Sequence, residues 1–158
     1  MSLSTNLLDA LSPKNRIFVA FSGGLDSTAL LFLCNKALKQ KKIRNLKAIH
    51  INHNLSKNSY NWQQHCEIFC RSNDIKFESF MVEVPKNRSS IESQARQARY
   101  KIFESLLDEN DQILLAHHRD DVFETILLRL FRGTGVDGLS VLNEKRSLGK
   151  GEIIRPFL

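Results

Sequence analysis

The fold is decided by the stretch Ile17-Phe18-Val19-Ala20-Phe21-Ser22-Gly23-Gly24-Leu25-Asp26-Ser27. Its first five residues form a short apolar run with β-branched and aromatic side chains, which predicts a buried β-strand. The two glycines then break the strand, and Asp26-Ser27 opens a helix whose apolar positions continue to Leu38. A buried strand that passes through a tight turn directly into a helix is typical of an α/β protein.

The same alternation of strand and helix continues along the chain. Predicted strands cover residues 46–51, 75–84, 113–116 and 152–156, and predicted helices cover residues 58–71, 91–107 and 120–131. Ser89 or Ser90 is the expected N-cap of the helix at 91–107. Because the connections are short, we predict an α/β fold with a Rossmann-like, doubly wound and mostly parallel sheet, covered by helices on both faces.

Length and composition are those of one folded domain. The chain has 158 residues, of which 42% are hydrophobic and 25% charged, enough to bury a core. Its longest apolar runs are too short to span a bilayer, and its first 16 residues lack the layout of a signal peptide. We therefore expect no membrane contact and a cytoplasmic location.

Charge and cysteine usage narrow the class further. The formal net charge is +6 and the isoelectric point is about 9.4, which favours polyphosphate or nucleic-acid ligands. The chain has an odd number of cysteines, Cys34, Cys66 and Cys70, and none of them forms a C-x-x-C pair. We expect reduced thiols that line the core, and the missing pair argues against a zinc ribbon or a cysteine-held iron–sulfur cluster.

Polar residues collect where three of the predicted strands end. They are the Gly23-Gly24 turn, the stretch Asn52-His53-Asn54, and the stretch His117-His118-Arg119-Asp120-Asp121. Parallel strands end at one edge of a sheet, and the ligands of such sheets bind beyond that edge. We therefore expect three groups that are distant in sequence to converge on one site.

The glycine turn is suited to phosphate. Gly23 and Gly24 let backbone N–H groups approach a ligand, and the helix behind them adds unpaired N–H groups and a partial positive charge. Ser22 and Ser27 add hydroxyl donors. Asp26 would repel phosphate unless it holds Mg²⁺, which bridges phosphate oxygens; its alternative role is the helix N-cap.

The cluster at residues 117–121 runs into a predicted amphipathic helix. One side of this helix is apolar, and the other carries Asp121, Arg129 and Arg132. Acidic residues early and basic residues late also suit the helix dipole, so the order of charges alone does not identify a site. A metal site shared by the two histidines is disfavoured, because adjacent residues at a strand end point to opposite faces.

The turn motif resembles that of a known family. Ser22-Gly23-Gly24-Leu25-Asp26-Ser27, placed after an apolar strand, looks like the pyrophosphate loop of the PP-loop ATP pyrophosphatases. The resemblance implies an adenine nucleotide alpha hydrolase-like fold and cleavage of ATP between its α and β phosphates. It also implies that residues 22–27 bind ATP and grip the leaving pyrophosphate.

Four further stretches resemble the tRNA(Ile)-lysidine synthetase family within that group. They are residues 117–135 (HHRDDVFETILLRLFRGTG), 50–55 (HINHNL), 92–100 (ESQARQARY) and 155–158 (RPFL, in which Phe157 replaces a leucine). Together with the turn, they span the chain from Ile17 to Leu158.

This second resemblance implies a two-step reaction. The C2 oxygen of the wobble cytidine, in an isoleucine tRNA with a CAU anticodon, attacks ATP, and pyrophosphate leaves. The amine of free L-lysine then displaces AMP. ATP, Mg²⁺, this tRNA and lysine are therefore the expected ligands.

Candidate residues for each role follow from the same resemblance. The candidate catalytic residues are Asp26, Asp120, Asp121 and His117; the candidate magnesium ligands are Asp26 and Asp120; the candidate lysine-binding residues are Asp121 and Glu124; and the candidate contacts to tRNA or ATP phosphates are Arg96, Arg99, Arg129 and Arg132. The base that takes a proton from lysine stays open among His117, His118 and a carboxylate. Arg96 has an alternative role, an ion pair with Glu92 one helical turn away.

The resemblance covers an N-terminal catalytic domain. Residues 1–158 are expected to be the PP-loop ATP-binding domain, without the C-terminal domains that help this family to bind tRNA. The last strand would then lack a covering helix, and its exposed apolar surface would favour a homodimer. Two alternatives stay open: another PP-loop enzyme, such as a tRNA thiolase or an amidating synthetase, and a fragment that binds ATP without catalysis.

Overall fold

The computed structural model describes residues 3–82, 91–118 and 143–158. Its strands are β1 (Arg16–Ala20), β2 (Asn45–Asn52), β3 (Lys76–Met81), β4 (Gln112–Leu114), β5 (Lys145–Leu148) and β6 (Gly151–Ile154). They form one six-stranded sheet with the order β3-β2-β1-β4-β6-β5. Neighbouring strands are parallel except β5 and β6, which are antiparallel.

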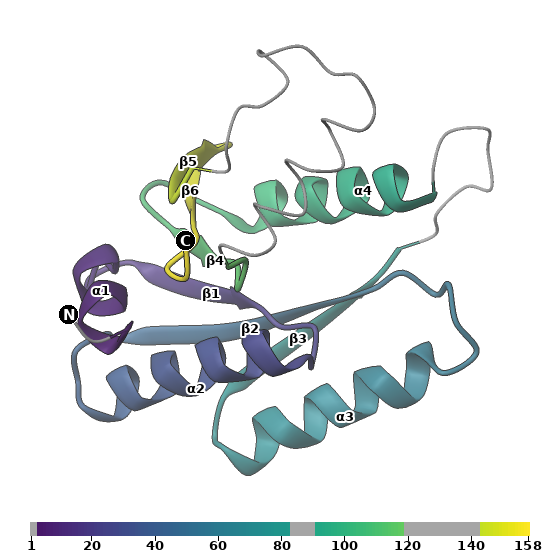
Figure 1. Cartoon of the computed structure of the whole chain (residues 1–158), viewed down its shortest axis with the longest axis horizontal. Helices are drawn as coiled ribbons and strands as arrows, with labels where there is room; N and C mark the ends of the chain where they lie inside the picture. Colours follow the sequence, from purple (N-terminus) through teal and green to yellow (C-terminus); the bar gives the residue numbers. More distant parts are fainter. Residues whose placement is uncertain (1–2, 83–90, 119–142) are drawn as a thin grey trace.

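Helices cover both faces of this sheet (Figure 1). They are α1 (Leu3–Ala10), α2 (Leu25–Lys39), α3 (Ser59–Ser72) and α4 (Ile91–Leu106). α2 and α3 lie on one face, and α4 lies on the other. The predicted doubly wound, mostly parallel α/β fold is therefore confirmed.

The predicted elements within the described ranges are present, with small shifts at their ends. β3 ends at Met81, one residue before Val82, and the last two residues of that predicted strand, Glu83 and Val84, lie outside the described residues. The same holds for the cap at Ser89 or Ser90 and for the helix predicted at 120–131. No helix in the described ranges is long and apolar enough to cross a bilayer.

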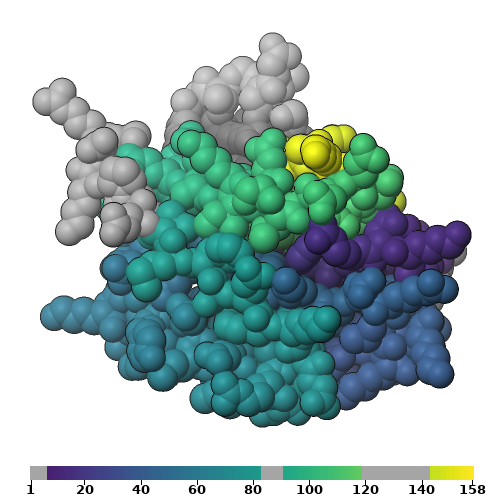
Figure 2. All heavy atoms as spheres, turned by 180° about the vertical axis from the view of Figure 1, so that it is seen from behind, coloured from purple at the N-terminus to yellow at the C-terminus, as the bar shows by residue number. Residues whose placement is uncertain are grey.

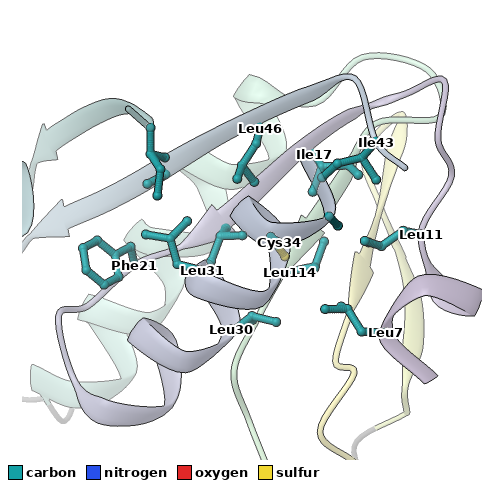
Figure 3. Close-up of a cluster of buried hydrophobic side chains, with 14 of the residues drawn as sticks. Leu7, Leu11, Ile17, Phe21, Leu30, Leu31, Cys34, Ile43, Leu46 and Leu114 are labelled. Atoms are coloured by element: carbon teal, nitrogen blue, oxygen red, sulfur yellow. The ribbon is translucent and has the colours of Figure 1, made fainter. Parts of the chain in front are cut away.

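Alternation along the first strand builds two cores. Ile17, Val19 and Phe21 belong to the core on the α2–α3 side, where they pack with residues such as Leu31 (Figure 3). Phe18, between them in sequence, belongs to the core on the α4 side. Successive side chains of a strand point to opposite faces, so a strand buried on both faces is apolar throughout. This is why the run is visible in the sequence.

The N-terminal helix α1 is absent from the sequence prediction. Leu7 and Leu11 of this segment are buried in the α2–α3 core. The side chain of Gln112 accepts a hydrogen bond from the Ser12 amide (2.8 Å) and donates one to the Ala10 carbonyl (3.3 Å). In the view from behind (Figure 2), this purple segment lies between the blue α2 region and the green region of α4 and β4. Two buried leucines in a polar segment are too short a pattern to predict a helix.

The C-terminal strands differ from the prediction. The edge strand β5, which the sequence does not predict, pairs with β6 through a turn at Gly149, whose φ is +56°. Most of β5 is exposed and polar, so no apolar pattern marks it. The expected exposure of the last strand is wrong: Ile153 and Ile154 are buried, one in each core. The apolar surface that favoured a homodimer is therefore not found there, and the homodimer stays a prediction.

Candidate active site

A cavity of about 690 Å³ opens at the carboxyl ends of β1, β2 and β4. The direction of winding reverses here, because β2 and β3 lie on one side of β1 while β4 lies on the other. Ligands of open α/β sheets bind at this kind of switch point. The expected convergence is confirmed for the described residues, since the lining includes Ser22, Gly24, Asp26, Ser27, Asn52, His53, Asn54 and His117.

Gly23 makes the turn at the mouth of this cavity. Its φ is +81°, and a Cβ at this position would lie 2.8 Å from Sγ of Cys66. The Ser22 carbonyl accepts a hydrogen bond from the indole Nε1 of Trp62. Burial raises the pKa of the Cys66 thiol to about 11, so this group packs and does not act as a nucleophile. Two side chains of α3, one helical turn apart, thus brace the turn.

The turn leads into the amino end of α2. Gly24 is the N-cap, in extended conformation, and no side chain caps the helix. The hydroxyl oxygens of Ser22 and Ser27 lie 3.0 Å apart, and the Gly24 N–H donates to the Ser22 hydroxyl at 3.3 Å. The Ser27 hydroxyl donates to the Gly24 carbonyl at 3.0 Å. Two hydroxyls therefore lie beside uncapped backbone N–H groups, an arrangement that suits a phosphate.

Asp26 is the second residue of α2, so its alternative role as N-cap is wrong. Its side chain is 55% exposed, and one carboxylate oxygen lies 3.6 Å from Nε2 of His118. Within the described ranges, no three His, Cys, Asp or Glu side chains are grouped to hold a metal. Mg²⁺ at phosphate sites takes one or two carboxylates and fills its other positions with phosphate and water, so a single exposed carboxylate fits.

β2 contributes a buried histidine. His50 is 5% exposed, and its Nδ1 lies 2.8 Å from the Phe21 carbonyl oxygen. A carbonyl can only accept, so Nδ1 carries the proton. Burial lowers the pKa of His50, although the bond to Phe21 acts in the opposite direction, and the imidazole is held neutral. His50 thus ties β2 to the strand end that carries the glycine turn.

His53 and Arg99 line the cavity with unsatisfied nitrogen atoms. Nδ1 of His53 and Nε of Arg99 are buried and have no hydrogen-bond partner in the part of the chain that the structure describes. Burial lowers the pKa of Arg99. Burial, with smaller effects of Arg99 and His50, lowers the pKa of His53. A guanidinium that is partly removed from water favours an anionic partner, as a phosphate contact requires.

His117 lines the cavity next to a buried arginine. Arg155 is 1% exposed, and its Nε donates to Nδ1 of His117 at 3.3 Å. Its other two nitrogens donate to the Asn143 carbonyl (2.7 Å) and to the Tyr100 hydroxyl (3.5 Å). Arg155 belongs to the stretch 155–158 that resembles the family, and the sequence alone indicates no role for it.

Arg96 does not line the cavity. Its guanidinium lies 5.0 Å from the centroid of the Tyr100 ring and donates to the Tyr100 hydroxyl at 3.3 Å. The alternative ion pair with Glu92 is not among the ion pairs of the described residues. The remaining candidates lie outside the described residues: Asp120, Asp121, Glu124, Arg129 and Arg132.

Trp62 is a site residue that the sequence prediction does not include. It is 51% exposed and lines the cavity. Tryptophan combines an apolar surface with one N–H donor, and this dual character was the available signal.

A family model for the PP-loop domain matches residues 2–158. The chain belongs to this family. The predicted membership of the PP-loop group is thereby confirmed, and ATP binding by this PP-loop domain is supported.

The PP-loop domain is also similar to curated proteins. It is 46% identical over 156 residues to tRNA(Ile)-lysidine synthase of Legionella pneumophila (strain Lens), which covers 99% of this chain and 36% of that protein. The protein of the same name from Pseudomonas syringae pv. tomato is 44% identical over 159 residues (99% and 36%), and that from Coxiella burnetii is 42% identical over 152 residues (96% and 34%). The chain thus spans about a third of the length of these relatives.

Among solved structures, the PP-loop domain is similar to the U34-tRNA thiolase NcsA from Methanococcus maripaludis with its [4Fe-4S] cluster. The TM-score is 0.71 at 21% sequence identity, over 98% of this chain and 57% of that chain. At this identity the likeness shows a shared fold alone.

Proposed function

We propose that this PP-loop domain is the ATP-binding catalytic part of a tRNA(Ile)-lysidine synthase, a ligase of tRNA processing. The wobble cytidine of a tRNA(Ile) with a CAU anticodon is adenylated by ATP, which releases pyrophosphate. Free lysine then replaces AMP and forms a carbon–nitrogen bond at C2. The observation that carries the proposal is the 46% identity to a curated lysidine synthase over 99% of the chain.

Adenylation requires a grip on the leaving pyrophosphate. We assign this role to the backbone N–H groups of Gly23, Gly24 and Leu25 and to the two serine hydroxyls, whose oxygens lie 3.0 Å apart. The Leu25 side chain is 85% exposed, so this residue contributes its backbone. Donors that are already in place stabilise the charge that develops on the leaving group, without reorganisation during the reaction.

Asp26 is the proposed magnesium ligand, and Asp120 is the second candidate. The carboxylate of Asp26 lies in the first turn of α2, directly after the phosphate-binding turn. Bound Mg²⁺ would neutralise charge on the phosphates. Nε2 of His118 lies 3.6 Å from one oxygen of the same carboxylate.

The second step requires recognition of a cationic amino acid. Carboxylates are strong partners for ammonium groups, and we propose Asp121 and Glu124 for this role, with Asp120 as a further candidate. One histidine of the rim or one of these carboxylates accepts the proton that the attacking amine loses.

Basic residues provide the proposed contacts to phosphate. Arg99 is the best placed, because it lines the cavity and its Nε has no partner among the described residues. Arg96 does not line the cavity, so we propose that it contacts RNA and not ATP. Arg129 and Arg132 are further candidates. The net charge of +6 favours a polyanionic substrate.

A cytoplasmic location and reduced cysteines are part of the proposal. Cys34, Cys66 and Cys70 are buried and unpaired. Burial raises the pKa values of Cys34 and Cys70 to about 12. Thiols of such low acidity are poor nucleophiles, so no catalytic role is assigned to them.

The test is pyrophosphate release from ATP with Mg²⁺, L-lysine and a tRNA(Ile) transcript bearing CAU, each omitted in turn. We expect release to require both the transcript and Mg²⁺, and lysine then to enter the RNA. A transcript with another anticodon is the matched control. Release that depends on a different co-substrate, such as a sulfur donor, would indicate another PP-loop enzyme. ATP binding without release would indicate a non-catalytic ATP-binding fragment.

A further inference from the structure

We infer that Arg155 is a positioning residue for His117: its guanidinium fixes the imidazole in the tautomer that carries the proton on Nε2. His117 then meets the substrate as a hydrogen-bond donor and not as a base. The tautomer follows from the contacts alone, whereas its catalytic consequence rests on the proposed function.

Each nitrogen of the Arg155 guanidinium has its own partner. Nε donates to Nδ1 of His117 (3.3 Å), Nη1 to the Asn143 carbonyl (2.7 Å) and Nη2 to the Tyr100 hydroxyl (3.5 Å). The residue is 1% exposed, so water hardly competes for these donors. Partners on three separate segments hold the planar guanidinium in one orientation.

The backbone around Arg155 reinforces this arrangement. The Leu115 N–H donates to the Ile154 carbonyl at 2.9 Å, and His118 forms a parallel bridge with Phe157. The segment that follows β6 therefore runs alongside the segment that follows β4. Arg155 and His117 lie within these two segments, so their contact is fixed from both sides.

Chemistry decides the direction of the hydrogen bond between them. A guanidinium has five N–H donors and no acceptor, and it stays charged in proteins. Nδ1 of His117 must therefore be the acceptor, and in a neutral imidazole the proton then lies on Nε2. A proton on Nδ1 would oppose two N–H groups next to a buried positive charge.

The consequence concerns the proton acceptor of the lysine step. Nδ1 of His117 is occupied by Arg155, and Nε2 already carries a proton, so this imidazole cannot act as the base while the contact lasts. It can donate from Nε2 to an oxygen of an anionic ligand, and a positioned donor stabilises charge that develops there. The base must then be another group, such as His118 or a carboxylate.

Long-range nitrogen–proton NMR correlations, on the chain labelled at its histidine nitrogens, report the tautomer directly. The structure provides an internal control, because Nδ1 of His50 donates to the Phe21 carbonyl. His50 and His117 are therefore expected in opposite tautomers. The signal that disappears in the His117→Gln variant is that of His117. A proton on Nδ1 of His117 in the wild-type protein would overturn the inference.

Variants test the role of the arginine. Arg155→Met removes the donor, and the His117 signal should lose its pure Nε2–H pattern; Arg155→Lys, which keeps a charge and a donor, should retain it. Arg146→Met is the matched control, because that guanidinium lies 5.4 Å from the same Tyr100 ring and its side chain is exposed. An unchanged His50 signal shows that the fold is intact. With His50 unchanged, an unchanged His117 tautomer in Arg155→Met would refute the positioning role. Loss of the His50 signal in Arg155→Met would show that this variant does not fold. The tautomer of His117 in the wild type and in Arg155→Lys then decides the inference.

Kinetics separate this inference from the proposed function. In the pyrophosphate-release assay, Arg155→Met should lower kcat by about 10–100-fold, the range typical of losing the hydrogen-bond partner that orients a metal-ligating histidine. The KM for ATP should change little, since the phosphate-binding turn is untouched. A raised KM with unchanged kcat would contradict positioning. If the wild-type protein releases no pyrophosphate, the proposed function fails, while the tautomer measurement still decides the inference.

Discussion

At the scale of single residues, Gly23 has a positive φ and little room for a side chain. A side chain in the left-handed region costs about 1–2 kcal/mol. The Cβ would also lie 2.8 Å from Sγ of Cys66, so one of the two must move. Its neighbour Gly24 has a φ of −74°, and a Cβ there would meet the Ser22 hydroxyl at an ordinary 3.4 Å.

We therefore expect Gly23→Ala to lower the free energy of unfolding by about 1–3 kcal/mol. Gly24→Ala, the matched control at an N-cap, should cost less than about 1 kcal/mol. Urea unfolding of both variants and the wild type measures the difference. Equal losses in the two variants would contradict the assigned turn geometry.

His50 makes stability depend on pH. Burial lowers its pKa in the folded state, so the unfolded chain binds this proton more readily in mild acid. The stability contribution is complete above the ordinary pKa of about 6.5 and is lost as the pH falls below it, with a slope of at most about 1.4 kcal/mol per pH unit. His50→Asn keeps an N–H donor for the Phe21 carbonyl and removes the titration, so we expect a smaller slope.

Urea unfolding above and below that pH tests this expectation. Some slope should remain in His50→Asn, because the pKa of His53 is lowered as well. His65→Asn, at an exposed position of α3, is the control. The same slope in His50→Asn as in the wild type would show that His50 is not the titrating group.

At the scale of elements, the site and a stabilising ion pair lie at opposite ends of the strands. The site is at the carboxyl ends, and the ion pair is at the amino ends of β1 and β4. Arg16 begins β1, and its Nε donates to both carboxylate oxygens of Asp111 at 3.1 and 3.0 Å. Asp111, which precedes β4, also accepts from the Asp108 N–H at 2.8 Å. Burial alone would raise the pKa of Asp111, but Arg16 and the Asp108 amide outweigh it, so the pKa is lowered.

We expect Asp111→Ala to lower the free energy of unfolding by about 1–3 kcal/mol, because the buried acceptor of this network is lost. Asp108→Ala should cost at most about 1 kcal/mol, since that carboxylate is 75% exposed. Neither change should alter ATP affinity, because the ion pair lies at the amino ends of β1 and β4, away from the cavity. Chemical unfolding and an ATP titration of both variants check this. A large loss of ATP affinity in Asp111→Ala would show that the ion pair at the amino ends of the strands is coupled to the site at their carboxyl ends.

The elements that the sequence predicts share a strong local pattern. The first strand is apolar from Ile17 to Ala20 because it is buried on both faces, and α2 shows helical spacing of leucines. α1 and β5 lack such patterns: α1 is short and polar in much of its sequence, and β5 is an exposed polar edge strand that forms through the turn at Gly149. Their formation depends on docking against β4 and β6, which no local pattern records.

At the scale of the whole molecule, the location of the site is predictable and its supporting contacts are not. The carboxyl ends of parallel strands meet on one side of the sheet. The sequence therefore predicts that the Gly23-Gly24 turn and the stretch Asn52-His53-Asn54 lie close together. The bond from Trp62 to Ser22 and the bond from Arg155 to His117 join residues 40 and 38 positions apart. Such pairs depend on three-dimensional packing, for which sequence spacing gives no signal.

We propose that residues 22–27 at the β1–α2 turn bind the phosphates of ATP. The most direct measurement is a titration of the chain with α,β-methylene-ATP and Mg²⁺, followed through its backbone amide NMR signals. We expect saturable shifts concentrated in Ser22–Ser27, with weaker effects at His53 and Arg99, and displacement by pyrophosphate. No binding, or shifts that leave this turn unchanged, would contradict the account.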